Sequence, residues 1–137
     1  MSDAPTLEDF RRMDLAAKYP QLIGAELTAC GGGHAEVALP WREDLGQHNG
    51  FLHGALVGFL ADYACAWAAG SLGGSVVTAS YTLNILAPGI GERFIGRGDV
   101  VKASRRQITC RADVFAVQAG EEKLIAIANA VIMPLKE

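Results

Sequence analysis

A polar, glycine-containing segment leads directly into an apolar stretch that carries a single acid. The segment is Gln47–Ala55, and Asp62 lies nine residues after His53. A carboxylate inside a buried helix is costly unless it is paired or functional, so Asp62 is a candidate catalytic base or nucleophile. The first turn of a helix offers unpaired N–H groups and a partial positive charge, which can stabilise a developing oxyanion. Because Gly54 has no side chain, a substrate carbonyl can approach its N–H closely.

Helix geometry separates Asp62 from His53 within one chain. At about 100° and about 1.5 Å per residue, nine residues place them on opposite sides of a helix and about 13 Å apart along it. Two antiparallel copies of the helix about a two-fold axis would instead set Asp62 of one subunit against His53 and Gly54 of the other. If these residues act together, the protein is at least a dimer with two equivalent sites.

The surrounding pattern predicts a short helix, a hairpin, one long helix and four further antiparallel strands. Thr6 followed by acids predicts a helix over about 6–17, which ends before Pro20 because the residue preceding a proline disfavours helix. Apolar runs around Gly31–Gly33 predict the hairpin, and the long helix is expected from near His53 to about Gly70. The strands are expected over residues 22–29, 35–39, 76–85, 92–102, 107–117 and 123–134.

Residues 76–85 alternate with a period of two, which is typical of a half-buried strand. Strict alternation places Val77, Ala79, Tyr81, Leu83 and Ile85 on one side and Val76, Thr78, Ser80, Thr82 and Asn84 on the other. The long helix is apolar on nearly every face and must therefore be covered on nearly every face. Period and composition thus predict one domain over residues 1–137, an antiparallel sheet packed on one helix.

The motif Gln47-x-x-Gly50-x-x-His53-Gly54-Ala55 with Asp62, followed by the strand ending in Asn84-Ile85-Leu86-Ala87-Pro88, resembles the hotdog thioesterases of the PaaI-like and 4-hydroxybenzoyl-CoA groups. The resemblance covers roughly residues 22–134. It implies an α+β hotdog fold, a curved antiparallel sheet wrapped around one central helix. It also implies hydrolysis of an acyl- or aryl-CoA thioester to free acid and coenzyme A by a homodimer or homotetramer.

The same resemblance implies a role for each motif position. Asp62 would be the catalytic carboxylate, as general base toward water or as nucleophile, and Gly54 would supply the oxyanion N–H. His53 would orient the loop and help to position the thioester. Gln47 stands where family members place an amide that binds the water or the substrate, and Thr78 matches a hydroxyl residue that orients the water.

This chain departs from the family pattern at two positions. Ala55 replaces the second glycine after the histidine, and Gln47 accompanies Asp62 where the family pairs Asn with Asp or Gln with Glu. The second departure leaves open whether Asp62 activates water or attacks directly. Asn49 is an alternative amide for the same role. The expected substrate contacts are Asn49, Gly50, Ala55 and, for the coenzyme A phosphates, Arg105 and Arg106, with Lys102 as a further basic candidate.

Composition excludes several other classes of protein. With 12 Lys and Arg against 15 Asp and Glu, the net charge of -3 argues against a nucleic-acid binder. The acidic N-terminus has no export signal, and the three widely spaced cysteines form no metal-type pair, so we expect a cytoplasmic protein with reduced thiols. Asp62 in the middle of the apolar stretch argues against a membrane span. We expect no metal and no cofactor, since coenzyme A is part of the substrate.

Two other functions are compatible with the sequence. Hotdog proteins also hydrate or dehydrate acyl-CoAs with a histidine and an acid, which would have to flank the α and β carbons of the substrate. A non-catalytic acyl-CoA-binding module would keep the fold without turnover. Ala55 and the pairing of Gln47 with Asp62 favour this last alternative.

Overall fold

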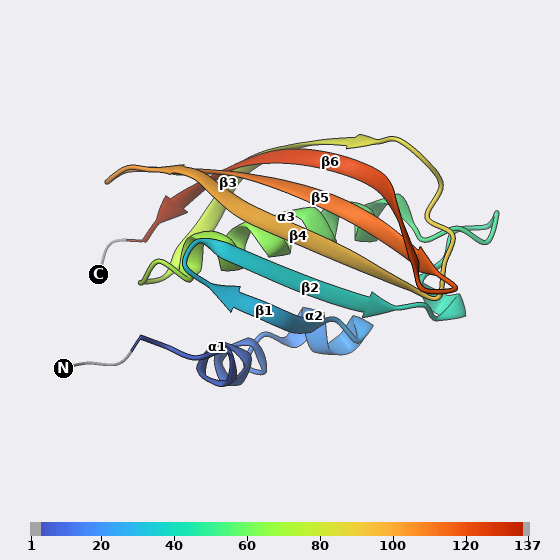
Figure 1. Ribbon diagram of the computed structural model, residues 1–137, viewed down its shortest axis with the longest axis horizontal. Coiled ribbons are helices and arrows are strands. Elements are labelled where there is room, and N and C mark those ends of the chain that lie inside the picture. The colour runs from blue at the N-terminus through green and yellow to red at the C-terminus, as the bar shows by residue number, and fades with distance from the viewer. Residues whose placement is uncertain (1–3, 136–137) are drawn as a thin grey trace.

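The computed structural model describes residues 4–135, which form one antiparallel sheet curved around a long helix (Figure 1). The helices are α1 (Leu7–Asp14), α2 (Lys18–Ile23), the short 3-10 helix η1 (Glu43–Leu45) and the central α3 (Gly54–Gly70). The strands are β1 (Glu26–Gly31), β2 (His34–Pro40), β3 (Val76–Ile85), β4 (Arg93–Ala103), β5 (Ile108–Gln118) and β6 (Glu121–Pro134). The sheet order is β1-β2-β4-β5-β6-β3, with every neighbouring pair antiparallel. The predicted α+β hotdog fold is confirmed.

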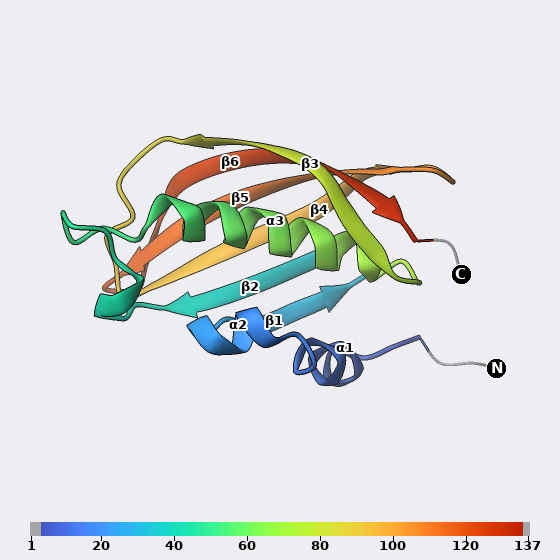
Figure 2. The ribbon, with the colours of Figure 1, turned by 180° about the vertical axis from the view of Figure 1, so that it is seen from behind.

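The N-terminal segment differs from the single helix predicted over residues 6–17. The Thr6 hydroxyl accepts the Asp9 N–H, as the capping pattern predicts, but α1 ends at Asp14 and a second helix, α2, follows. Pro20 lies in the first turn of α2, where the backbone N–H groups need no acceptor within the helix. The prediction therefore missed α2, and the first residues assigned to the hairpin are helical. Both helices lie along the β1 edge of the sheet (Figure 2).

Small residues let α3 lie unusually close to the sheet. The helix contributes alanines to this contact, and β4 contributes two glycines. A Cβ atom on Gly98 would lie 2.6 Å from the backbone of Ala64, and one on Gly96 would overlap the Leu60 carbonyl oxygen. The core between helix and sheet includes fully buried Leu60, Val37, Phe94, Ile125 and Ile132. The distance from α3 to β4 is therefore set by backbone contact.

Replacing Gly96 with alanine should destabilise the fold by about 1–3 kcal/mol, the usual cost of overpacking a dense core. The added methyl group meets main-chain atoms of Leu60, which cannot turn aside as a side chain can. Urea unfolding measures the change. Gly70→Ala is the matched control, because its Cβ atom would meet Val76 at 3.9 Å, an ordinary contact. Equal stability of Gly96→Ala and native protein would contradict the close approach.

A β-bulge changes which side of β3 each residue faces. Thr78 pairs with Ile132 and Ser80 pairs with Val131 on β6, so Ala79 is an extra residue. Strict alternation, which separates Thr78 from Tyr81, is therefore wrong beyond residue 78. Thr78 and Tyr81 both face α3. β3 is also less buried than predicted, because it forms an edge of the sheet.

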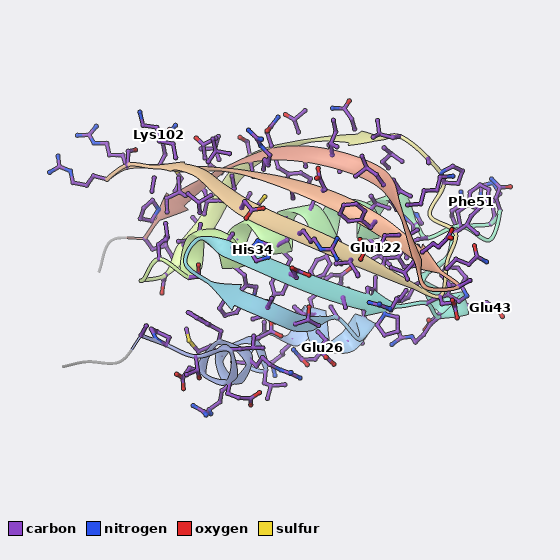
Figure 3. All side chains as sticks on the ribbon, in the orientation of Figure 1. Glu26, His34, Glu43, Phe51, Lys102 and Glu122 are labelled. Carbon is purple, nitrogen blue, oxygen red and sulfur yellow. The ribbon has the colours of Figure 1, made fainter. Side chains whose placement is uncertain are left out.

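Charged side chains on the outer side of the sheet bind one another. His34 contacts Asp99 at 2.8 Å and Glu36 at 2.9 Å, and Arg97 binds Glu36 at 3.2 Å. Arg97 also donates two hydrogen bonds to Glu122, which hold the pKa of Glu122 below its usual value. Figure 3 shows His34 and Glu122 on this side of the molecule. Arg97 is thus engaged by two carboxylates, which makes it a poor candidate for binding a substrate phosphate.

Candidate active site

The loop before α3 is held by backbone hydrogen bonds from two directions. The Leu52 N–H donates to Gly89 at 2.9 Å, and the His53 N–H donates to Leu45 at 3.0 Å. Within the loop, the Gln47 N–H donates to Phe51 at 2.8 Å. These contacts fix the point at which α3 begins.

The N-terminus of α3 presents one free N–H group. The carbonyl oxygen of His53 accepts the N–H groups of Leu56 and Val57, and its ring Nδ1 accepts the Ala55 N–H at 3.1 Å. Within residues 4–135, no hydrogen bond joins the Gly54 N–H to an acceptor. Because Nδ1 accepts, the neutral His53 ring carries its proton on Nε2. Gly54 therefore offers the donor that an oxyanion needs, and His53 caps the helix beside it.

Asp62 lies in the middle of α3 and is held by Thr78. The Thr78 hydroxyl donates to Oδ1 of Asp62 at 2.6 Å, and both residues are half-buried. In the described part of the chain, the other carboxylate oxygen has no hydrogen-bond donor. The sequence did not predict this contact, since the family resemblance implies only that Thr78 orients the water. A fixed carboxylate with one oxygen available is suited to accept a proton from water.

Asp62 belongs to a stripe of α3 that the sheet reaches only along one side, where Thr78 of β3 contacts Asp62. We call this stripe the open face; its members are Ala55, Phe59, Asp62 and Ala66, all exposed or half-buried. Their spacing of three and four residues places them on one side of the helix. The edge strand β3 flanks the stripe and exposes several large apolar side chains. These are Val77 (50%), Tyr81 (43%), Ile85 (50%) and, just beyond the strand, Leu86 (55%).

One chain does not bring all the predicted site residues together. Gly54 and Asp62 are eight residues apart on one helix, about 12 Å along its axis. The side-chain oxygen of Gln47 accepts the Asn49 N–H, so this pair is joined within the loop rather than to Asp62. Gly50, with a positive φ of 83°, forms the turn of the same loop.

The predicted coenzyme A contacts lie far from that loop. Arg105 and Arg106 are exposed in the turn between β4 and β5, and none of the ion pairs in residues 4–135 includes them. Figure 3 shows Lys102, close to this turn, at the opposite end of the molecule from Phe51. Within one chain, the basic turn and the loop before α3 therefore belong to opposite ends of the fold.

A buried contact next to Asp62 was not predicted. The Tyr63 hydroxyl donates to Asp14, a carboxylate of α1 that is only 5% exposed. Burial, followed by this hydrogen bond, raises the pKa of Tyr63. Phe59 stacks on Tyr63 at 4.9 Å between ring centroids, and Tyr19 of α2 meets Phe59 edge-on. The two N-terminal helices thus bound the open face on the side away from β3. The only sequence signal for this cluster is the helical spacing of its aromatic residues Phe59 and Tyr63.

Two further findings concern metal binding and membrane-spanning helices. No cluster of three or more His, Cys, Asp or Glu side chains in the described residues is placed to hold a metal ion. None of the helices found between residues 4 and 135 combines the length and apolar character needed to cross a bilayer.

Comparison with known proteins places this geometry in a family. The thioesterase superfamily model matches residues 49–123, more than half of the chain. A thioesterase family protein from Silicibacter pomeroyi has 33% identity and a TM-score of 0.90, covering 96% of this chain and 99% of that one. A single-site mutant of the phenylacetic acid degradation protein PaaI from Thermus thermophilus has 31% identity and a TM-score of 0.77, covering 87% and 100%. A comparison with curated proteins finds no match.

More distant structures share the fold. The PaaI protein of the phenylacetic acid degradation operon of E. coli is 18% identical, with a TM-score of 0.84 over 94% of this chain and 92% of that one. The region matched by the family model contains the start of α3, Asp62 and Thr78. The resemblance read from the motif is thereby confirmed. The chain belongs to the thioesterase superfamily and is a thioester hydrolase.

Proposed function

We propose that the protein hydrolyses acyl-CoA thioesters in a site shared by two subunits, with Asp62 as general base. The observation that carries the proposal is the half-buried carboxylate on the open face of α3, fixed by Thr78 through one oxygen. The free N–H of Gly54 is the second part of the site. A base and an oxyanion donor are sufficient for thioester hydrolysis, because the thiolate leaves readily. The reaction needs no cofactor, and coenzyme A is part of the substrate.

The proposed chemistry runs in two steps. Asp62 takes a proton from water as the water oxygen attacks the carbonyl carbon, and the carbonyl oxygen becomes an oxyanion held by the Gly54 N–H of the partner subunit. The tetrahedral species then collapses and the carbon–sulfur bond breaks. The thiolate takes up the proton that Asp62 accepted from water. The products are the free acid and coenzyme A. Direct attack by Asp62 is the alternative: its carboxylate oxygen would displace the thiolate and form a mixed anhydride. Water that then attacks the Asp62 carbonyl carbon of this anhydride would leave isotope from labelled water in the Asp62 carboxylate after one turnover.

The two-subunit arrangement follows from the separation of the two groups. Asp62 and Gly54 face the same way on one helix, about 12 Å apart, so one thioester cannot contact both within a single chain. An antiparallel second copy of α3 closes the distance. The exposed apolar residues of β3 and the unpaired edge of that strand support a second copy of this chain as the covering partner.

The same arrangement gives the basic turn a role. In one chain, Arg105 and Arg106 belong to the turn that follows Lys102, and Figure 3 shows Lys102 at the end opposite Phe51 of the loop before α3. An antiparallel partner places its own loop at the end that carries this turn. The phosphates of coenzyme A can then reach Arg105 and Arg106 while the thioester lies near Asp62. His53 and Gln47 of the partner subunit would orient the loop and bind the water or substrate there, with Asn49 as the alternative amide.

Release of free thiol from a panel of short, medium, long and aryl acyl-CoAs tests the proposed function. We expect turnover of at least one class, without added metal or cofactor. If a folded dimer releases no thiol from any member, the proposal is wrong. Loss of enoyl-CoA absorbance would then indicate a hydratase, and ligand binding without any reaction would indicate a binding module.

A further inference from the structure

Tyr81 lies against the backbone of α3 inside the proposed site. A Cβ atom on Gly58 would lie 2.8 Å from the Tyr81 hydroxyl and 3.6 Å from its ring, so the hydroxyl end of Tyr81 fills the space that a side chain at Gly58 would take and the ring lies next to it. Tyr81 is 43% exposed, and no hydrogen bond joins its hydroxyl to another group within residues 4–135. Its ring therefore forms a wall rather than part of the sealed core.

Three successive turns of α3 each meet one side chain of β3. The pairs are Gly54 with Ile85 at 3.5 Å, measured from an added Cβ, Gly58 with Tyr81, and Asp62 with Thr78 at 2.6 Å. Tyr81 thus occupies the turn between the oxyanion donor and the base. It lies one helical turn from Asp62, about 6 Å along the helix axis.

The antiparallel pairing fixes where this wall lies in the dimer. A register that sets Asp62 opposite Gly54 of the partner subunit also sets Gly58 opposite Gly58 of the partner subunit, at the two-fold axis. Tyr81 therefore lies beside the axis, about one helical turn from the reacting carbon. Coenzyme A must leave the site toward solvent and the basic turn, so the acyl group extends the other way, toward Tyr81.

We propose that Tyr81 closes the acyl channel and restricts the substrates to compact acyl groups, such as a short aliphatic chain or a single ring. This specificity role rests on the proposed thioesterase function and on the shared site. The carbonyl lies beside Asp62, which leaves about one helical turn, about 6 Å, for the acyl group before it meets the Tyr81 ring. Because the ring does the closing, the phenol hydroxyl is dispensable for this limit.

The test compares kcat/KM across a series of straight-chain acyl-CoAs for three variants. For native protein we expect kcat/KM to fall steeply once the acyl chain is longer than about 6 Å, which is about one helical turn. Tyr81→Ala should raise the ratio of long-chain to short-chain kcat/KM at least tenfold, while Tyr81→Phe keeps the native ratio. Thr82→Ala is the matched control, because Thr82 is also exposed on the same strand and, as the neighbour of Tyr81, points to the other side of it.

Binding measurements separate this inference from the hydrolysis proposal. Calorimetric titration of the same series into Asp62→Asn and into Asp62→Asn with Tyr81→Ala reads the length limit without turnover. A relaxed limit in the double variant supports the role of Tyr81 even if no hydrolysis occurs. An unchanged length profile of Tyr81→Ala in both experiments, or equal use of long and short chains by native protein, would overturn it. If Tyr81→Ala does not fold, Tyr81→Leu keeps an apolar contact with Gly58 and is judged by the same ratio.

Discussion

Replacing Asp62 with asparagine should lower kcat for thioester hydrolysis by about 10²–10⁴-fold, the range that general-base catalysis contributes. The amide has the shape of the carboxylate, and its oxygen still accepts the Thr78 hydroxyl, but it cannot take a proton from water. Since Asp62 in this role acts on water, acyl-CoA binding should change little. Thiol release gives kcat, and calorimetry with the same acyl-CoA gives the affinity.

Asp113→Asn is the matched control for this substitution. Asp113 is also half-buried, but it lies on β5, on the outer side of the sheet with Arg97. The Asp113→Asn variant should hydrolyse thioesters at the native rate. If Asp62→Asn kept more than about a tenth of native kcat, a loss of less than about 1.4 kcal/mol of transition-state stabilisation, Asp62 would not be the base.

Replacing Gly54 with proline should lower kcat by about 10²–10³-fold, the effect of losing one oxyanion donor. Proline has no N–H, yet it is well tolerated at the first position of a helix. The preceding residue, His53, has φ of -59° and ψ of 136°, in the extended region that a following proline favours. The substitution therefore removes the proposed donor with little change to the helix. Gly54→Ala keeps the N–H and meets Ile85 at an ordinary 3.5 Å, so it should lose much less kcat than Gly54→Pro, its methyl group hindering only the approach of the substrate.

Mixing these two inactive variants tests whether two subunits share the site. A hybrid of one Asp62→Asn subunit and one Gly54→Pro subunit has one intact site and one doubly altered site. Random exchange in an equal mixture should therefore restore about a quarter of native activity. The exchange is followed by mass spectrometry under native conditions. Hybrid dimers without recovered activity would place base and donor in the same chain, contrary to the proposed arrangement.

Elements whose signals are local could be predicted from the sequence. The capped start of α1, the extent of α3 and the four strands after it agree with prediction within one or two residues. Capping residues, apolar periodicity and turn glycines each act over a few residues, so these signals can be recognised in a single sequence. The family resemblance singled out Asp62 and Thr78 separately, and the structure adds that they are in contact.

Features that depend on tertiary packing could not be predicted. The pairing of β3 with β6 makes Ala79 an extra, unpaired residue. A strict alternation of residues along β3 cannot predict such a bulge. The contact between Tyr63 and Asp14 joins residues 49 positions apart. Tyr19, the residue before Pro20, is helical although the local rule disfavours helix there, and Pro20 itself lies in the first turn of α2, where its missing N–H costs no hydrogen bond. In each case a long-range contact or position within an element outweighed local preference.

The contact of α3 with Gly96 and Gly98 has a mechanical consequence for catalysis. Side chains in a core can change rotamer when the protein is warmed, compressed or mutated, but two main chains already in contact have no such freedom. The height of Asp62 above the sheet should therefore stay constant across conditions that loosen the rest of the core. Evolution could then vary the apolar residues around α3, and with them the shape of the proposed acyl channel, without moving the proposed base.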